Sequence, residues 1–156
     1  MPPGWQEDRT ALLRRLLGRV GERVTIGDGF HCDYGHHIFL GEDFYANYNL
    51  TILDAAPVTF GDHVFVGPSC GFYTSSHALD PAARAAGVER ADPITVGNNV
   101  WIGGGVIVLP GVSIGDGAII GAGSVVTRDV RPGMIAAGNP CRELRPAESD
   151  SVPRPK

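Results

Sequence analysis

The chain has 156 residues, enough for one domain, and 43% of them are hydrophobic, so it can bury a core. A formal net charge of -4 disfavours nucleic acid as the main partner, because a phosphate-binding surface usually shows as an excess of Lys and Arg. Three cysteines without a CxxC pair indicate neither a disulfide framework nor a thiolate zinc site. The sequence shows no signal peptide and no apolar run of membrane-spanning length, which predicts a cytoplasmic protein.

The first predicted element is a short amphipathic helix over residues 5–17, which Gly18 ends. One side of this helix is rich in leucine and the other is charged. A helix of this length is marginal in isolation. We therefore expect residues 1–21 to form a helical cap over one open end of the domain that follows.

A repeat with a period of six residues comes next and is clearest between residues 96 and 126. Its aliphatic positions are Val96, Ile102, Val108, Ile114, Ile120 and Val126. A second column, two residues earlier in each repeat, is small or aliphatic: Ile94, Val100, Val106, Val112, Ala118 and Ser124. Neither a helix nor a lone strand has this period, whereas a coil of short strands and tight turns does. Residues 22–145 are therefore predicted to form an all-β solenoid, with both columns facing inward.

The sixfold register is less regular before residue 74, where it can be followed from Ile26 to Phe72. Three hexads make one triangular coil. The two tracts together predict four to five coils, stacked about 4.8 Å apart by parallel backbone hydrogen bonds.

Residues 74–93 interrupt the repeat and are predicted to form one extruded loop. A long loop in a repeat protein is usually functional, because its ordering costs entropy and adds nothing to the core. Beyond the solenoid, residues 146–156 are polar and rich in proline, which predicts a disordered tail.

The histidines do not predict a metal site. A zinc centre needs three or four converging ligands, but His31, His36 and His37 crowd into one irregular stretch, and no second histidine follows His77 in the loop. His63 lies at a corner turn and is predicted to be solvated. We expect no metal cofactor.

His77 opens the extruded loop, between hydroxyl residues and Asp80. An imidazole titrates near neutral pH, so it can take a proton from an attacking hydroxyl and later return it to a leaving group. His77 is therefore a candidate general base. On position alone, a loop histidine that caps backbone groups is the more common explanation.

The tract from Phe44 to Asp54 holds a second candidate set. Asn47 stands where the repeat would place glycine, and two amides and a carboxylate within eight residues suit hydrogen bonding to a polyol. Stacked asparagines can equally satisfy the backbone of turns. Both interpretations stay open at this point.

Several runs of residues resemble the maltose and galactoside O-acetyltransferases of the hexapeptide-repeat superfamily. They are Tyr45–Asn47, Leu50–Asp54, His77, Pro93–Gly104, Gly121–Thr127 and Ala136–Arg142. The resemblance covers roughly residues 22–145. It implies a left-handed parallel β-helix and a homotrimer, with acetyl-CoA in the groove between neighbouring subunits and the loop of one subunit completing a neighbour's site.

On the acceptor side, the resemblance implies that His77 is the general base and that Asn47 contacts the acceptor and the transition state. Asp33 and Tyr45 match positions that line the acceptor pocket. Asp54 lies at or beside a further acceptor-binding acid.

On the donor side, the resemblance implies that Trp101 packs against the pantetheine arm of CoA. Gly104 and Ala122 match positions whose backbone groups hydrogen-bond that arm. The positions that match contacts to the nucleotide end, where cations would meet phosphates, are Thr127, Arg128, Arg142 and Arg145.

Together these features predict an acetyl-CoA-dependent O-acetyltransferase for a sugar or related small acceptor. The chain departs from the family at Ala55, where some relatives have a second acid, and in its shorter N-terminal helical segment. One alternative is an acyltransferase for an amine, a xenobiotic or an amino-acid hydroxyl, which would share the donor-side residues. Another is a non-catalytic or metal-bearing hexapeptide scaffold, which would need neither Trp101 nor the arginines.

Overall fold

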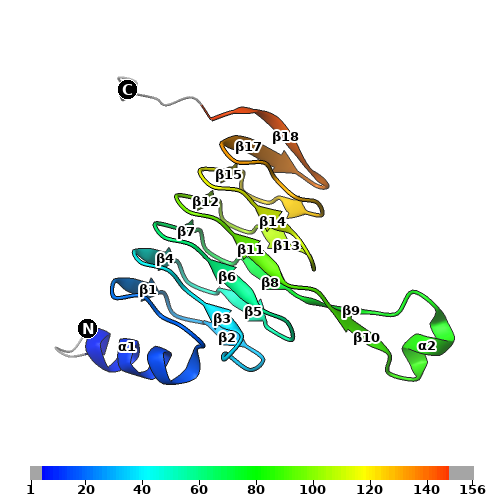
Figure 1. Ribbon diagram of the computed structural model, residues 1–156, viewed down its shortest axis with the longest axis horizontal. Coiled ribbons are helices and arrows are strands. Elements are labelled where there is room, and N and C mark those ends of the chain that lie inside the picture. The colour runs from blue at the N-terminus through cyan, green and yellow to red at the C-terminus, as the bar shows by residue number, and fades with distance from the viewer. Residues whose placement is uncertain (1–4, 148–156) are drawn as a thin grey trace.

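The computed structural model describes residues 5–147 and shows a three-sided parallel β-solenoid with one projecting arm (Figure 1). The helix α1 (Trp5–Leu16) lies at the N-terminal end of the coil, as predicted. Residues 1–4 and residues 148–156, which include most of the predicted tail, lie outside the described residues. Pro146, where that tail was expected to begin, is still the last residue of a strand.

Three parallel sheets form the sides of the coil. The seven-stranded sheet contains β1 (Val24–Ile26), β4 (Phe44–Ala46), β7 (Phe65–Val66), β12 (Trp101–Ile102), β15 (Ile119–Ile120), β17 (Met134–Gly138) and the antiparallel β18 (Cys141–Pro146). The five-stranded sheet contains β2 (His31–Cys32), β5 (Thr51–Leu53), β8 (Gly71–Tyr73), β13 (Ile107–Val108) and β16 (Val125–Val126). The four-stranded sheet contains β3 (Ile38–Phe39), β6 (Val58–Phe60), β11 (Ile94–Val96) and β14 (Ser113–Ile114).

The coil makes about six turns, so the expected four to five was too low. The missing turns come from strands that lack the aliphatic-glycine signature. β2 begins with a histidine, and β17 lies beyond the last regular hexad. Backbone pairing with the neighbouring coil holds both strands in place.

Both predicted columns are confirmed as core. Every member of each column is at most 3% exposed, including Ser124. Inside the coil, the ring of Phe60 meets those of Phe44 and Phe72 edge to face, one ring from each sheet, with centroids 5.0 and 4.9 Å apart. Such aromatic pairs stabilise a core by about 0.5–1.5 kcal/mol beyond the area that they bury.

The repeat glycines are required by the close approach of successive coils. A Cβ atom added to Gly103 would lie 2.6 Å from the backbone nitrogen of Ala122 in the next coil, closer than real side chains come. Glycine at the corner therefore allows the coils to stack at the spacing of a parallel sheet.

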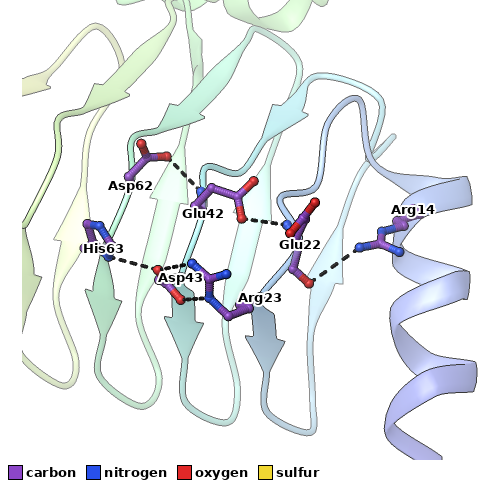
Figure 2. Close-up of polar contacts among 7 residues, drawn as sticks. All are labelled: Arg14, Glu22, Arg23, Glu42, Asp43, Asp62 and His63. Carbon is purple, nitrogen blue, oxygen red and sulfur yellow. Dashed lines mark hydrogen bonds and ion pairs between the residues drawn. The ribbon is translucent and has the colours of Figure 1, made fainter.

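At the corner between the four- and seven-stranded sheets, acidic side chains link one coil to the next (Figure 2). The backbone N–H of Glu22 donates to the Glu42 carboxylate at 2.8 Å, and the N–H of Glu42 donates to Asp62 at 2.8 Å. The N–H of Asp62 in turn donates to the Asn98 side chain at 2.9 Å. These bonds satisfy backbone N–H groups in the turns, which the pairing between strands leaves without a partner.

Leu13 of the helix α1 and Leu17, just after its end, join the buried core, whereas Leu12 stays largely exposed. Arg9 holds the helix to the first coil through an ion pair with Asp28 at 2.6 Å. Within residues 5–147, no helix is long and apolar enough to cross a membrane.

Candidate active site

The predicted site residues fall on different edges of the three-sided coil. Each turn of the chain runs from the seven-stranded to the five-stranded and then to the four-stranded sheet. We call the corner between the seven- and five-stranded sheets the first edge, the corner between the five- and four-stranded sheets the second edge, and the corner shown in Figure 2 the third edge. The second edge lies opposite the seven-stranded sheet.

One group of predicted residues lies on the seven-stranded sheet and the first edge. Tyr45 and Trp101 point outward and are 40% and 57% exposed. Gly104 and Ala122 occupy the first edge on adjacent coils, where the carbonyl of Gly104 accepts from the N–H of Gly123 at 2.9 Å. This side of the molecule thus combines apolar surface with a backbone that large side chains do not cover.

Asn47 also lies on the first edge and is half-buried. Its side-chain oxygen accepts from the N–H of Tyr48 at 2.8 Å. The side chain therefore does satisfy a turn, as one of the two interpretations expected. Its amide NH₂ group is a separate donor, which a ligand can still use.

Phe65 joins Tyr45 and Trp101 into one exposed surface, which we call the aromatic stripe. Strand register places Phe65 beside Tyr45 on one side and beside Trp101 on the other. The rings of Tyr45 and Phe65 are 6.2 Å apart between centroids. The sequence analysis did not single out Phe65, although its place one coil after Tyr45 could have indicated that the two residues lie side by side.

A second group of predicted residues lies on the second edge. It comprises Asp33, the projecting arm with His77, and the exposed residues Thr127 and Arg128 after β16. The remaining arginines, Arg142 and Arg145, are exposed on β18 at the C-terminal end of the coil. Within one chain, the structure therefore does not bring Tyr45 and His77 together.

Asp54, predicted to lie at or beside an acceptor-binding acid, has a fully buried carboxylate in this chain. It accepts from the backbone N–H groups of Asp33, Tyr34 and His37 at 3.1, 2.9 and 3.3 Å. The ring of His37 also contacts the Asp54 carbonyl at 2.9 Å. Asp54 thus shapes the loop that carries Asp33.

Replacing Asp54 by asparagine should weaken acceptor binding without affecting the donor. The amide places N–H donors against backbone N–H donors, and bonds to a charged acceptor contribute about 1.5–3 kcal/mol. We expect the acceptor KM to rise about tenfold while the Kd for CoA stays within about twofold. Steady-state kinetics and calorimetry measure the two values. An equal loss of both affinities would mean that the substitution only damages the fold.

The arm is an antiparallel hairpin of β9 (Ser75–His77) and β10 (Glu89–Ala91), joined through the short helix α2 (Pro81–Ala85). Its base is fixed by the buried Thr74, whose hydroxyl donates to the Leu53 carbonyl at 2.7 Å and accepts from the Ala56 N–H at 3.0 Å. Farther out, α2 buries none of its residues and Leu79 is 95% exposed. The arm is anchored at its base and makes little contact with its own coil (Figure 1).

Glu89 is a residue that sequence analysis missed. The hairpin register places it directly opposite His77, and a Glu89 carboxylate oxygen lies 3.4 Å from Nδ1 of His77. A carboxylate at Nδ1 favours the tautomer that leaves Nε2 as the proton acceptor. No sequence periodicity indicates this pairing, because the loop lacks the alternation that marks strands.

Replacing Glu89 by glutamine should lower kcat about tenfold, because the amide orients and stabilises the imidazolium less well than a carboxylate. Glu89→Asp should recover part of the loss. The Kd for CoA and the melting temperature should match those of the unmodified protein. A kcat unaffected by Glu89→Gln would show that the pair has no part in proton transfer.

The three cysteines are poor nucleophiles. Burial raises the pKa of Cys70 and Cys141 above the usual value for a thiol. Burial and the Asp54 and Asp33 carboxylates raise that of Cys32. Because the thiolate is the reactive form, these environments disfavour a covalent cysteine intermediate.

The four-stranded sheet carries a depression of about 490 Å³ between Thr95 and Arg131, and none of the predicted site residues lines it. Among the described residues, no group of three His, Cys, Asp or Glu side chains could hold a metal ion.

Known proteins share this architecture. Residues 93–128 match the family described as bacterial transferase hexapeptide (six repeats). The galactoside O-acetyltransferase of Escherichia coli K12 is 43% identical over 143 residues, which are 92% of this chain and 70% of that protein. The chain belongs to the galactoside and maltose O-acetyltransferase family.

Solved structures agree with this assignment. A galactoside acetyltransferase in complex with coenzyme A superposes with a TM-score of 0.94 at 41% identity, covering all of this chain and 78% of the other. A maltose O-acetyltransferase from Clostridium difficile 630 gives a TM-score of 0.92 at 44% identity, covering 96% of this chain and 80% of the other. The predicted left-handed β-helix of hexapeptide repeats is confirmed, and the chain is an acetyltransferase of this family.

Proposed function

We propose that this chain transfers an acetyl group from acetyl-CoA to a hydroxyl of a sugar or related small molecule, in active sites formed between the subunits of a homotrimer. The observation that carries this proposal is the division of the predicted residues between two parts of one coil. Tyr45 and Trp101 lie on the seven-stranded sheet, whereas the arm with His77 leaves from the opposite edge. Only a second copy can place His77 beside Tyr45.

The arm supports assembly for a further reason. Its exposed apolar residues, Leu79 and Val88, make no core contact in the chain alone. Burying such side chains against a neighbour stabilises an assembly. A head-to-tail contact of this kind closes into a ring when its rotation is 120°.

In the proposed reaction, Nε2 of His77 takes the proton from the acceptor hydroxyl as the oxygen attacks the thioester carbonyl. The carbonyl oxygen becomes an anion, which the Asn47 NH₂ group or backbone N–H groups stabilise. The carbon–sulfur bond then breaks, and the proton moves from His77 to the leaving thiolate. Acetyl-CoA and acceptor are held together in one complex, so no acetylated cysteine is formed.

The donor site combines residues of the seven-stranded sheet and the first edge with residues of the neighbouring subunit. Trp101 packs against the pantetheine arm, and the backbone at Gly104 and Ala122 hydrogen-bonds to it. The guanidinium groups of Arg128, Arg142 and Arg145 meet the phosphates at the nucleotide end. These exposed cations would form a local basic surface on a chain of net negative charge.

We place the reaction in the cytoplasm. All three cysteines are free thiols, two of them buried. Free thiols persist in a reducing compartment.

A thiol-release assay with acetyl-CoA tests the activity against a panel of sugars, amino sugars, small alcohols and amines. Release with hydroxyl acceptors and not with amines supports O-acetylation. Release with amines alone would replace the proposed acceptor class.

Subunit mixing tests the shared site. Asn47→Ala and His77→Ala should each lose activity. Co-expressed, they should recover about a quarter of it, because random assembly pairs an intact Asn47 with an intact His77 in about one site in four. No recovery in the mixed oligomer would place both residues in one chain's own site.

A further inference from the structure

Thr74 is one of three buried polar residues within residues 5–147, and it lies where the arm leaves the coil (Figure 1). Its hydroxyl bonds to both sides of one turn of the preceding coil, at the Leu53 carbonyl and the Ala56 N–H. Its backbone carbonyl accepts at 2.9 Å from the N–H of Asp92, the residue that follows β10. Both strands of the arm are therefore tied to the coil at this one residue.

The turn that binds Thr74 also holds the loop that carries Asp33. Asp54 lies in this turn, between Leu53 and Ala56, and is the second buried polar residue. Its carboxylate accepts from backbone N–H groups of the loop, including that of Asp33 at 3.1 Å. Because β2, β5 and β8 pair in that order, Asp54 and Thr74 link three successive coils along the second edge.

This network is closed to water and complete. Both side chains are fully buried, and within the described residues no buried side-chain oxygen or nitrogen lacks a hydrogen bond. A fully satisfied buried network is rigid, because hydrogen bonds are stronger in the low dielectric of an interior. Farther out, the arm makes little contact with its own coil, since α2 buries none of its residues. The network therefore sets where His77, three residues after Thr74, lies relative to Asp33.

We propose that Thr74 is a positioning residue for the acetyl transfer, which holds the general base at a fixed place relative to the acceptor loop of the same chain. The inference rests on the proposed function, because it takes His77 as the base and Asp33 as part of the acceptor pocket. Catalysis depends strongly on such placement, since an error of about 1 Å can lower a rate about 10²-fold.

Thr74→Val tests the role of the hydroxyl, because valine has a similar shape but cannot bond to Leu53 or Ala56. At saturating acetyl-CoA, kcat should fall at least about tenfold, since the base of the arm is no longer fixed. The Kd for CoA should stay within about twofold. Thr74→Ser keeps the hydroxyl and should recover most of kcat. Thiol release and calorimetry measure the two quantities.

Ser124→Ala is the matched control, because Ser124 is the third buried polar residue and its hydroxyl also makes two hydrogen bonds. It donates to the Gly121 carbonyl at 2.5 Å and accepts from the Gly138 N–H at 3.1 Å. Ser124 precedes β16 on the first edge, away from the arm. Both Thr74→Val and Ser124→Ala should lower the melting temperature. Only Thr74→Val should lower kcat when it is measured well below both transitions.

An unaltered kcat in Thr74→Val would overturn the inference alone, as would an equal fall of kcat in Ser124→Ala. If Thr74→Val does not fold, Asp92→Pro tests the same anchor from the other strand of the arm. Asp92 lies outside the buried core, and proline lacks the N–H that Thr74 binds. A normal kcat in Asp92→Pro would then overturn the inference. A normal kcat in His77→Ala would instead overturn the proposed function and, with it, the inference.

Discussion

Replacing His77 by alanine should lower kcat by about 10²- to 10⁴-fold, the usual contribution of a positioned general base. His77 lies on the arm, with a side chain that is 64% exposed, so its removal leaves no cavity in the core. The variant should therefore fold, assemble and bind acetyl-CoA as the unmodified protein does. Thiol release measures kcat, and calorimetry with CoA measures binding.

His31→Ala is a suitable control for this experiment, because His31 is also exposed but lies on β2 of the coil body. It should keep its turnover. If His77→Ala turned over acceptor at a rate close to that of the unmodified protein, the proposed proton transfer would be wrong.

Replacing Ile114 by aspartate should unfold the coil or reduce its free energy of unfolding by several kcal/mol, because a buried carboxylate without a partner is strongly unfavourable. Ile114 is 2% exposed and lies between Val96 of one coil and Val130 of the next. Domains are stable by only about 5–15 kcal/mol, so this loss is a large share of the total. Chemical denaturation followed by circular dichroism measures it.

Thr95→Asp provides the comparison, since Thr95 lies in the adjacent strand but faces outward and is exposed. Its free energy of unfolding should change by less than about 0.5 kcal/mol, as is usual for surface substitutions. A cooperatively folded Ile114→Asp protein with unaltered stability would show that the sixfold column does not form the core.

The sequence predicted the fold well because a six-residue period leaves little choice of architecture. A single buried column, from Val96 to Val126, is enough to indicate a triangular coil, and both predicted columns are buried. The predicted number of coils was too low because some strands do not show the repeat in their own sequence. β2 is held by pairing with β5 and not by its own pattern.

The surroundings of Asp54 could not be predicted from the sequence. Three backbone N–H groups from a loop some twenty residues earlier bind its carboxylate, and no local pattern indicates that contact. Glu89 was missed for a related reason. Its distance from His77 is set by the hairpin register, which the loop sequence does not reveal.

Residue type and spacing along the chain were enough to predict which residues face inward and where the repeat is interrupted. Which residues lie on the same edge follows only from the way the coil winds in three dimensions. Because each turn has three sides, Tyr45 and Trp101 lie two coils apart on the seven-stranded sheet. The arm with His77 leaves the coil at the opposite edge. The side of the coil on which a residue lies depends on where the chain turns. Corners of irregular length make that side hard to predict from the sequence.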